Sequence, residues 1–170
     1  MITHVANNIK VDEGVAIRRL TVEEIPLCEP FGRAFIAEKH VPGTFSLETF
    51  TRNWEFFLTR YPAVLLGLWS GERLIGGIGG MIAPDLNTGD RIAQEFFWYV
   101  TPEARHGTWP LRLLKQFREW GKEQGATRFR MVHLLGPDES PSTVKLARVY
   151  AKLGMRPIEV SYDAPMEKGT

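Results

Sequence analysis

The sequence predicts a single α/β (α+β) domain over residues 16–170, with a mixed, twisted sheet of about six or seven strands and helices on both faces. Three observations predict it. Segments with helical apolar spacing alternate with strand-like segments, no linker or repeat interrupts the 170 residues, and a strand–helix–strand unit spans residues 92–135. Such a unit is a right-handed crossover between parallel strands, whereas the hairpin before it is antiparallel. The sheet should therefore be mixed.

The N-terminal part of the chain predicts an arm, one strand and two helices. Residues 1–15 are polar and aperiodic, which is typical of a loose arm. A short strand at 16–20 precedes a capping box at 21–24, in which a hydroxyl and a carboxylate satisfy each other's free amides. The helix that follows runs to about residue 37, and Ser46 caps a second helix with apolar residues at helical spacing.

The middle of the chain predicts three consecutive strands. Residues 63–69 and 73–83 form a hairpin, and 85–90 makes a second turn rich in Asn, Asp and Gly. The segment 92–100 is apolar without alternation, so we expect a central strand covered on both faces. The glycine run at 76–80 matches no nucleotide-binding motif. It indicates close approach of a helix, a ligand or another chain.

The C-terminal part alternates helices and strands. Pro110 suits the first position of a helix, and Gly154 suits the left-handed position after the last one. The expected elements are a loop at 101–108, a helix ending near 125, a strand at 127–135, a loop at 136–142, a helix ending before 154, and a closing strand or strand pair at 155–166.

Composition excludes several classes of function. Lys plus Arg number 21 and Asp plus Glu 20, a balance that argues against a nucleic-acid partner. No stretch approaches ~18–20 uncharged apolar residues and no signal-peptide pattern appears, so we expect no membrane partner. The single cysteine agrees with a reducing, cytoplasmic location. The lone Cys28 excludes an internal disulfide and should be inert packing. The four histidines, His4, His40, His106 and His133, share no metal-ligand spacing, so no metal is expected.

Three local patterns resemble the GNAT family, the acetyl-CoA-dependent N-acyltransferases, within about residues 16–165. Gly-Glu-Arg-Leu-Ile-Gly at 71–76 is similar to the family's hairpin turn, and Trp-Tyr-Val-Thr-Pro-Glu-Ala-Arg at 98–105 to the stretch that enters its CoA loop. Residues 147–155 resemble the late helix that ends Tyr-x-Lys-x-Gly-Phe. The resemblance implies a GNAT-like fold, acetyl-CoA as co-substrate, and transfer of the acyl group to an amine of a small molecule or protein.

The family holds pyrophosphate with an Arg/Gln-x-x-Gly-x-Gly/Ala loop at a helix N-terminus, where free amides suit an anion. Counted from Arg105, Thr108 and Pro110 occupy the glycine positions, and a frame shifted onto Gly107 places Trp109 at the second one. Pro110 has no amide to donate, and a plain strand-to-helix connection is the alternative. The resemblance implies cofactor contacts from Val100, whose region supplies the amide that polarises the thioester, and from Arg105, His106, Gly107, Thr108, Trp109, Leu111 and Arg112.

Acyl transfer to an amine also needs a base and an acid. Glu95 is the candidate base because the aromatic residues at 96–98 would desolvate it and raise its pKa; a charged residue at a solvated strand end is the alternative. Tyr150 aligns with the family's general acid, although it also fits the apolar stripe of its helix. Thr143 stands where the family often has Asn, and His133 is a candidate to line an acceptor pocket or a structural histidine.

A second hypothesis is a catalytically degenerate GNAT-like binding, structural or assembly module. The altered phosphate loop and the aromatic residues around Trp54 and 96–98 favour it. Residues 94–105 also weakly resemble GNAT-like proteins encoded by bacteriophages, which would imply a virion location. The basic helix edge formed by Arg112, Lys115, Arg118 and Lys122 is interrupted by Glu residues and indicates a solvated face. A homodimer through a sheet edge or through the C-terminal strand, or an assembly partner, is expected from the fold alone.

Overall fold

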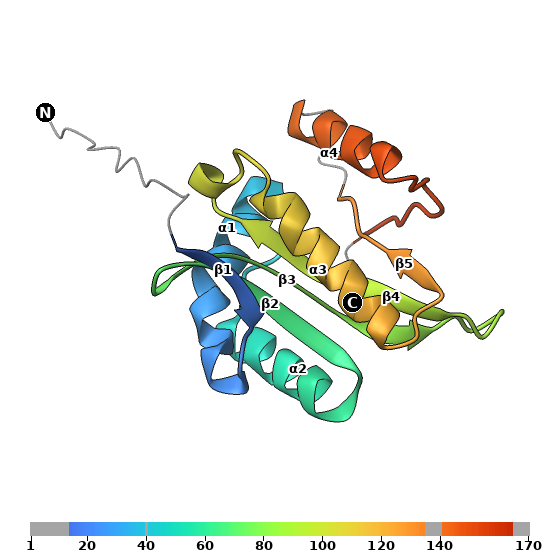
Figure 1. Cartoon of the computed structure of the whole chain (residues 1–170), viewed down its shortest axis with the longest axis horizontal. Coiled ribbons are helices and arrows are strands. Elements are labelled where there is room, and N and C mark those ends of the chain that lie inside the picture. Colours follow the sequence, from blue (N-terminus) through green and yellow to red (C-terminus); the bar gives the residue numbers. More distant parts are fainter. Residues whose placement is uncertain (1–13, 40, 135–140, 165–170) are drawn as a thin grey trace, which may run out of the picture. The chain divides into compact units, whose positions relative to one another are not determined.

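The computed structural model describes residues 14–39, 41–134 and 141–164, with the side chains of 141–143 left aside (Figure 1). The chain divides into two compact units between Val132 and His133. The expected arm at 1–15 lies almost wholly outside the described residues, as does most of the expected loop at 136–142. One domain over residues 16–170 stays a prediction.

A mixed sheet forms the centre of the first unit. Its strands are β1 (Val15–Arg19), β2 (Ala63–Ser70), β3 (Arg73–Pro84), β4 (Arg91–Val100) and β5 (Arg128–Arg130), and their spatial order follows the chain. Neighbouring strands are antiparallel except for β4 and β5, which are parallel. The predicted α/β class and mixed sheet are confirmed, with five strands in the described residues rather than six or seven.

The lower strand number comes from the closing strand or strand pair expected at 155–166, of which the structure describes residues 155–164. The strand predicted at 127–135 is only three residues long, and residues 155–164 contain no strand. The apolar side chains of Val132, Ile158 and Val160 are 46%, 52% and 62% exposed. Strand preference reflects packing against neighbours, so residues that favour strands do not form one where nothing buries them.

The helices that lie between β1 and β2 in the chain cover one face of the sheet. The helix predicted from residue 21 begins as a 3-10 segment, η1 (Val22–Cys28), which contains Pro26, and becomes α-helical in α1 (Glu29–Lys39). The capping box is present, because the Glu24 carboxylate accepts from the Thr21 amide at 3.0 Å. Next comes α2 (Leu47–Arg60), capped as expected by Ser46. Buried core residues on this face are Leu20, Ile25, Cys28, Phe31, Trp54, Leu65, Phe97 and Tyr99.

The glycine run in β3 lets helices approach both faces of the sheet. A Cβ at Gly79 would collide with the indole of Trp54 on α2. A Cβ at Gly80 would lie 2.6 Å from Cζ of Phe117, on α3 (Trp109–Glu123). The helices α2 and α3 therefore lie on opposite faces of the sheet, as predicted. The glycine run is expected to allow the close approach of a helix, a ligand or another chain, and in the structure it is helices that approach.

A β-bulge in β4 changes which face its side chains occupy. Gly80 pairs with Glu95 whereas Gly79 pairs with Phe97, so Phe96 is the extra residue. Glu95 thus shares the face of Gly80 and α3, while Phe97 belongs to the core on the other face. The bulge separates the candidate base from the aromatic core beside it.

The second unit contains α4 (Pro141–Lys152). It ends as predicted, with Gly154 in the left-handed region at φ 75°. The amide of Met155 returns to the Tyr150 carbonyl at 3.0 Å, which closes the last turn of this helix.

Candidate active site

Glu95 is a buried carboxyl group with a polar partner. Glu95 is only 5% exposed, and its Oε2 accepts a hydrogen bond from the Val132 amide at 2.9 Å. Burial raises the pKa of Glu95 to about 7, against the smaller opposing effect of that hydrogen bond. A carboxyl group that gains and loses its proton near neutral pH is suited to general-base work.

Glu95 lies where two parallel strands stop pairing. The β4–β5 ladder runs from Ile92 opposite Arg128 to Gln94 opposite Arg130 and then ends. Beyond it, β4 continues to Val100 while the other segment continues through Val132 without strand structure. In open α/β sheets, ligands bind beyond the carboxyl ends of parallel strands.

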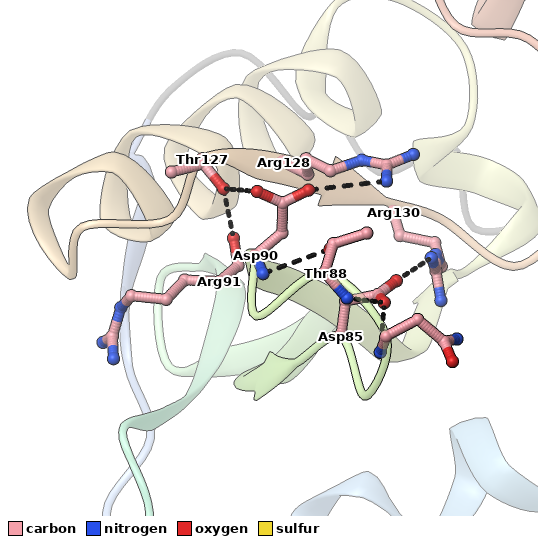
Figure 2. Close-up of polar contacts among 8 residues, drawn as sticks. Asp85, Thr88, Asp90, Arg91, Thr127, Arg128 and Arg130 are labelled. Carbon is pink, nitrogen blue, oxygen red and sulfur yellow. Dashed lines mark hydrogen bonds and ion pairs between the residues drawn. The ribbon is translucent and has the colours of Figure 1, made fainter.

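A polar cluster holds the start of β5 against the turn between β3 and β4 (Figure 2). Asp85 accepts from the amides of Asn87 and Thr88 at 3.0 and 3.1 Å, and these bonds lower the pKa of its carboxyl group. The same carboxylate lies 3.9 Å from Arg130. Asp90 lies 3.8 Å from Arg128 and accepts from the Thr127 hydroxyl at 3.3 Å. Together these contacts connect the start of β5 to the turn between β3 and β4.

The turn before α3 presents backbone amides to solvent. Gly107 has φ 101°, a conformation that favours glycine, and Thr108 precedes the helix without a capping side-chain bond. Within the part of the chain that the structure describes, no hydrogen bond is formed by the amides of His106, Gly107, Thr108, Trp109 and Leu111. These amides, together with the helix N-terminus, can bind an anion by donating hydrogen bonds to it.

Two groups near the predicted anion site, the Arg112 amide and the Trp109 indole, make other contacts. The amide of Arg112 donates to the Thr108 carbonyl at 2.9 Å, so only its side chain remains for a ligand. That guanidinium lies 4.6 Å from the Trp109 ring, and both residues line a groove of about 410 Å³ that also contacts Val15 and Ile17 of β1. The Trp109 indole therefore belongs to the groove between α3 and β1.

Arg105 is engaged in an ion pair that sequence reasoning missed. Its Nε donates to the Val100 carbonyl at 2.7 Å, and its Nη2 donates to both Glu38 oxygens at 2.7 and 3.0 Å. Tyr99 donates its hydroxyl proton to the same Glu38 at 2.8 Å. Burial is the largest cause that raises the pKa of Tyr99 to about 12, and the hydrogen bond to Glu38 and the charge of Glu38 are the next. A phosphate contact by Arg105, as the resemblance implies, would compete with Glu38. No local pattern links residues so far apart in the chain.

The second unit places two of the predicted residues together. Tyr150 is 9% exposed, and its ring lies edge-on to His133 with the ring centroids 5.9 Å apart. His133 does not lie on a strand, contrary to expectation, because β5 ends at Arg130. The roles of Tyr150 as an acid and His133 as an acceptor contact stay predictions.

Other expectations can be compared with the described residues. Cys28 is fully buried, as expected of a packing residue, and burial raises the pKa of its thiol to about 12. Among the residues that the structure describes, no helix is long and apolar enough to cross a membrane. The same residues contain no group of three or more metal-ligating side chains.

Comparison with known proteins identifies the fold. No family model and no curated protein sequence matches the chain. It superposes on a protein of Clostridium acetobutylicum described as a predicted acetyltransferase with acetyl-CoA (TM-score 0.70, 16% identity, 89% of this chain and 96% of that one). It is also similar to an aminoglycoside acetyltransferase from a soil metagenome (0.68, 16%, 91% and 99%). A third is the ribosomal-protein-alanine N-acetyltransferase of Brucella melitensis (0.63, 18%, 90% and 99%). The chain therefore has the GNAT fold.

Proposed function

We propose that this protein is an acetyl-CoA-dependent N-acyltransferase. The observation that carries the proposal is the buried Glu95, whose pKa of about 7 suits a base, at the point where β4 and β5 stop pairing. The unpaired amides at 107–109 and 111 supply the second requirement, a place for a diphosphate. The fold similarity to acetyltransferases, including one with acetyl-CoA, supports the same function.

The chain's residues divide the chemistry between them. The acyl carbon forms a bond to the acceptor nitrogen and loses its bond to the CoA sulfur. Glu95 takes the proton that the acceptor nitrogen releases, directly or through water. Tyr150 donates a proton to the departing sulfur, as the GNAT resemblance implies. The amides of Gly107, Thr108, Trp109 and Leu111 hold the diphosphate, and the Arg112 side chain adds positive charge. An amide near Val100 polarises the thioester carbonyl.

The acceptor is proposed only as an amine. One structural neighbour is named for aminoglycosides and another for a ribosomal-protein alanine, so the fold accommodates both small-molecule and protein acceptors. An aliphatic amine is mostly protonated at neutral pH, which is why a base with a raised pKa beside it is useful.

Isothermal titration calorimetry with CoA and acetyl-CoA tests the proposal. We expect saturable binding by the full chain. Once a panel of amines has given an acceptor, Glu95→Gln and Tyr150→Phe should bind acetyl-CoA as the wild type does but release free CoA more slowly. Absence of binding at millimolar CoA would contradict the enzyme hypothesis and favour the binding or assembly module, the virion-associated form included.

A further inference from the structure

The turn that presents the free amides is connected to α1 by one cluster of polar side chains. Glu38 lies near the C-terminal end of α1, Tyr99 near the end of β4, and Arg105 directly after η2 (Pro102–Ala104). All three belong to the first unit of the structure. The cluster therefore joins α1, β4 and the turn before α3.

The Arg105 guanidinium is held by one backbone carbonyl, one carboxylate and one aromatic ring. Nε reaches the Val100 carbonyl at 2.7 Å, Nη2 reaches Glu38 at 2.7 Å, and the group lies 5.0 Å from the Tyr99 ring centroid. A planar guanidinium with both edges engaged and a ring against it has little freedom to turn. Its backbone is thereby held in place two residues before Gly107.

We propose that Glu38 is a positioning residue for the anion site: through Arg105 it holds the turn at 105–109 so that the free amides converge on one point. This inference rests on the proposed function, because that function supplies the anion. The turn needs such support since Gly107 is open to solvent with φ 101°, and η2 is only three residues long. Diphosphate affinity depends on amides that are already oriented before binding.

The proposal assigns Arg105 a role different from direct phosphate binding, and the two roles predict opposite results. If Arg105 acts through Glu38, removing either partner weakens CoA binding by a similar factor, and removing both costs no more than removing one. If Arg105 binds phosphate itself, Glu38 competes for it. Neutralising Glu38 would then leave affinity unchanged or improve it, while neutralising Arg105 would be damaging.

The experiment compares Glu38→Gln, Arg105→Gln and the double variant, using calorimetry with CoA and amide hydrogen exchange without ligand. Glu29→Gln is the matched control, because Glu29 also lies on α1 and also forms a 2.7 Å ion pair, with Arg33. We expect CoA to bind about two- to fivefold more weakly in all three test variants, as for loss of a partly exposed ion pair. The control should bind CoA as the wild type does.

Exchange provides a readout that does not depend on CoA. The amides of Ala104, Arg105 and Arg112 donate to Thr101, Pro102 and Thr108 carbonyls and report on the order of the turn. They should exchange faster in Glu38→Gln but not in the control. Unchanged exchange, or unchanged affinity in Glu38→Gln, would overturn the positioning role while wild-type CoA binding stands. A wild type that binds no CoA would overturn the proposed function and the positioning role together.

Discussion

The Glu95 carboxylate accepts its hydrogen bond from the backbone amide of Val132, a residue 37 positions further along the chain. The contact joins β4 to the segment after β5, at the place where the two strands stop pairing. Because the Glu95 carboxyl group is buried and accepts one amide hydrogen bond, desolvation outweighs the stabilisation of its charge.

The first prediction concerns the pH dependence of turnover. Because the pKa of Glu95 is about 7, the base form accumulates as pH rises through 7, and the rate of CoA release should rise with it. Glu95→Gln should lose about 100-fold or more in rate and should also lose this rise. Initial rates at saturating acetyl-CoA from pH 5.5 to 8.5 measure both. A Glu95→Gln profile that retains the wild-type rise would assign the titration to another group.

The second prediction concerns stability. The pKa of Glu95 is raised from 4.5 to about 7, so the folded chain binds this proton more tightly than the unfolded chain. Its contribution is complete below pH 4.5 and is lost as pH rises through 7. Glu95→Gln keeps an acceptor for Val132 without the charge. It should be more stable than the wild type at pH 8 by on the order of 3 kcal/mol, and not at pH 4. Urea unfolding at both pH values tests this; equal differences at the two would contradict it.

The third prediction concerns the close packing at Gly80. A Cβ there would collide with the Gln94 carbonyl and lie 2.6 Å from Phe117, so Gly80→Ala must displace β4 or α3. We expect a loss of about 1–3 kcal/mol in unfolding free energy. Gly77→Ala is the comparison, because its Cβ would lie no closer than 3.1 Å to any atom. A loss at Gly80 no larger than that at Gly77 would show that the helix yields easily.

The fourth prediction separates backbone strain from ligand binding at Gly107. Gly107 and Gly43 have φ values of 101° and 102°, and a Cβ at either position meets no atom within 4 Å. Alanine at each should therefore cost a similar 1–3 kcal/mol, on the order expected for a left-handed non-glycine residue. Gly107→Ala should also weaken CoA binding, by about tenfold, because it moves the amide turn. Equal CoA affinities in the two variants, measured by calorimetry, would remove Gly107 from the site.

Local patterns predict much of the first unit. The alternation of apolar runs with turn residues predicts β2, β3 and β4 to within one residue of the observed bounds. The capping box at Thr21 and the cap at Ser46 are also confirmed, since each depends on residues three positions apart. The register of the β4 bulge is not readable in this way, because it depends on which glycine of β3 faces which residue of β4.

The predictions that differ from the structure depend on contacts between segments far apart in the chain. Residues 131–134 and 155–164 contain strand-forming side chains, yet strand structure requires a neighbouring edge and a covering layer. Arg105 matches the expected position for a phosphate contact, but Glu38 meets its guanidinium from a helix 67 residues earlier in the chain. A sequence pattern records residue types at short separations and contains no information on such meetings.

For this chain, short-range order specified helices, strands, caps and turns, since each rests on hydrogen bonds and side-chain spacing within a few residues. The raised pKa of Glu95 and the ion-pair partner of Arg105 arose when distant segments packed. Each depends on how much water is excluded and which charge is nearest, and both are properties of the assembled fold.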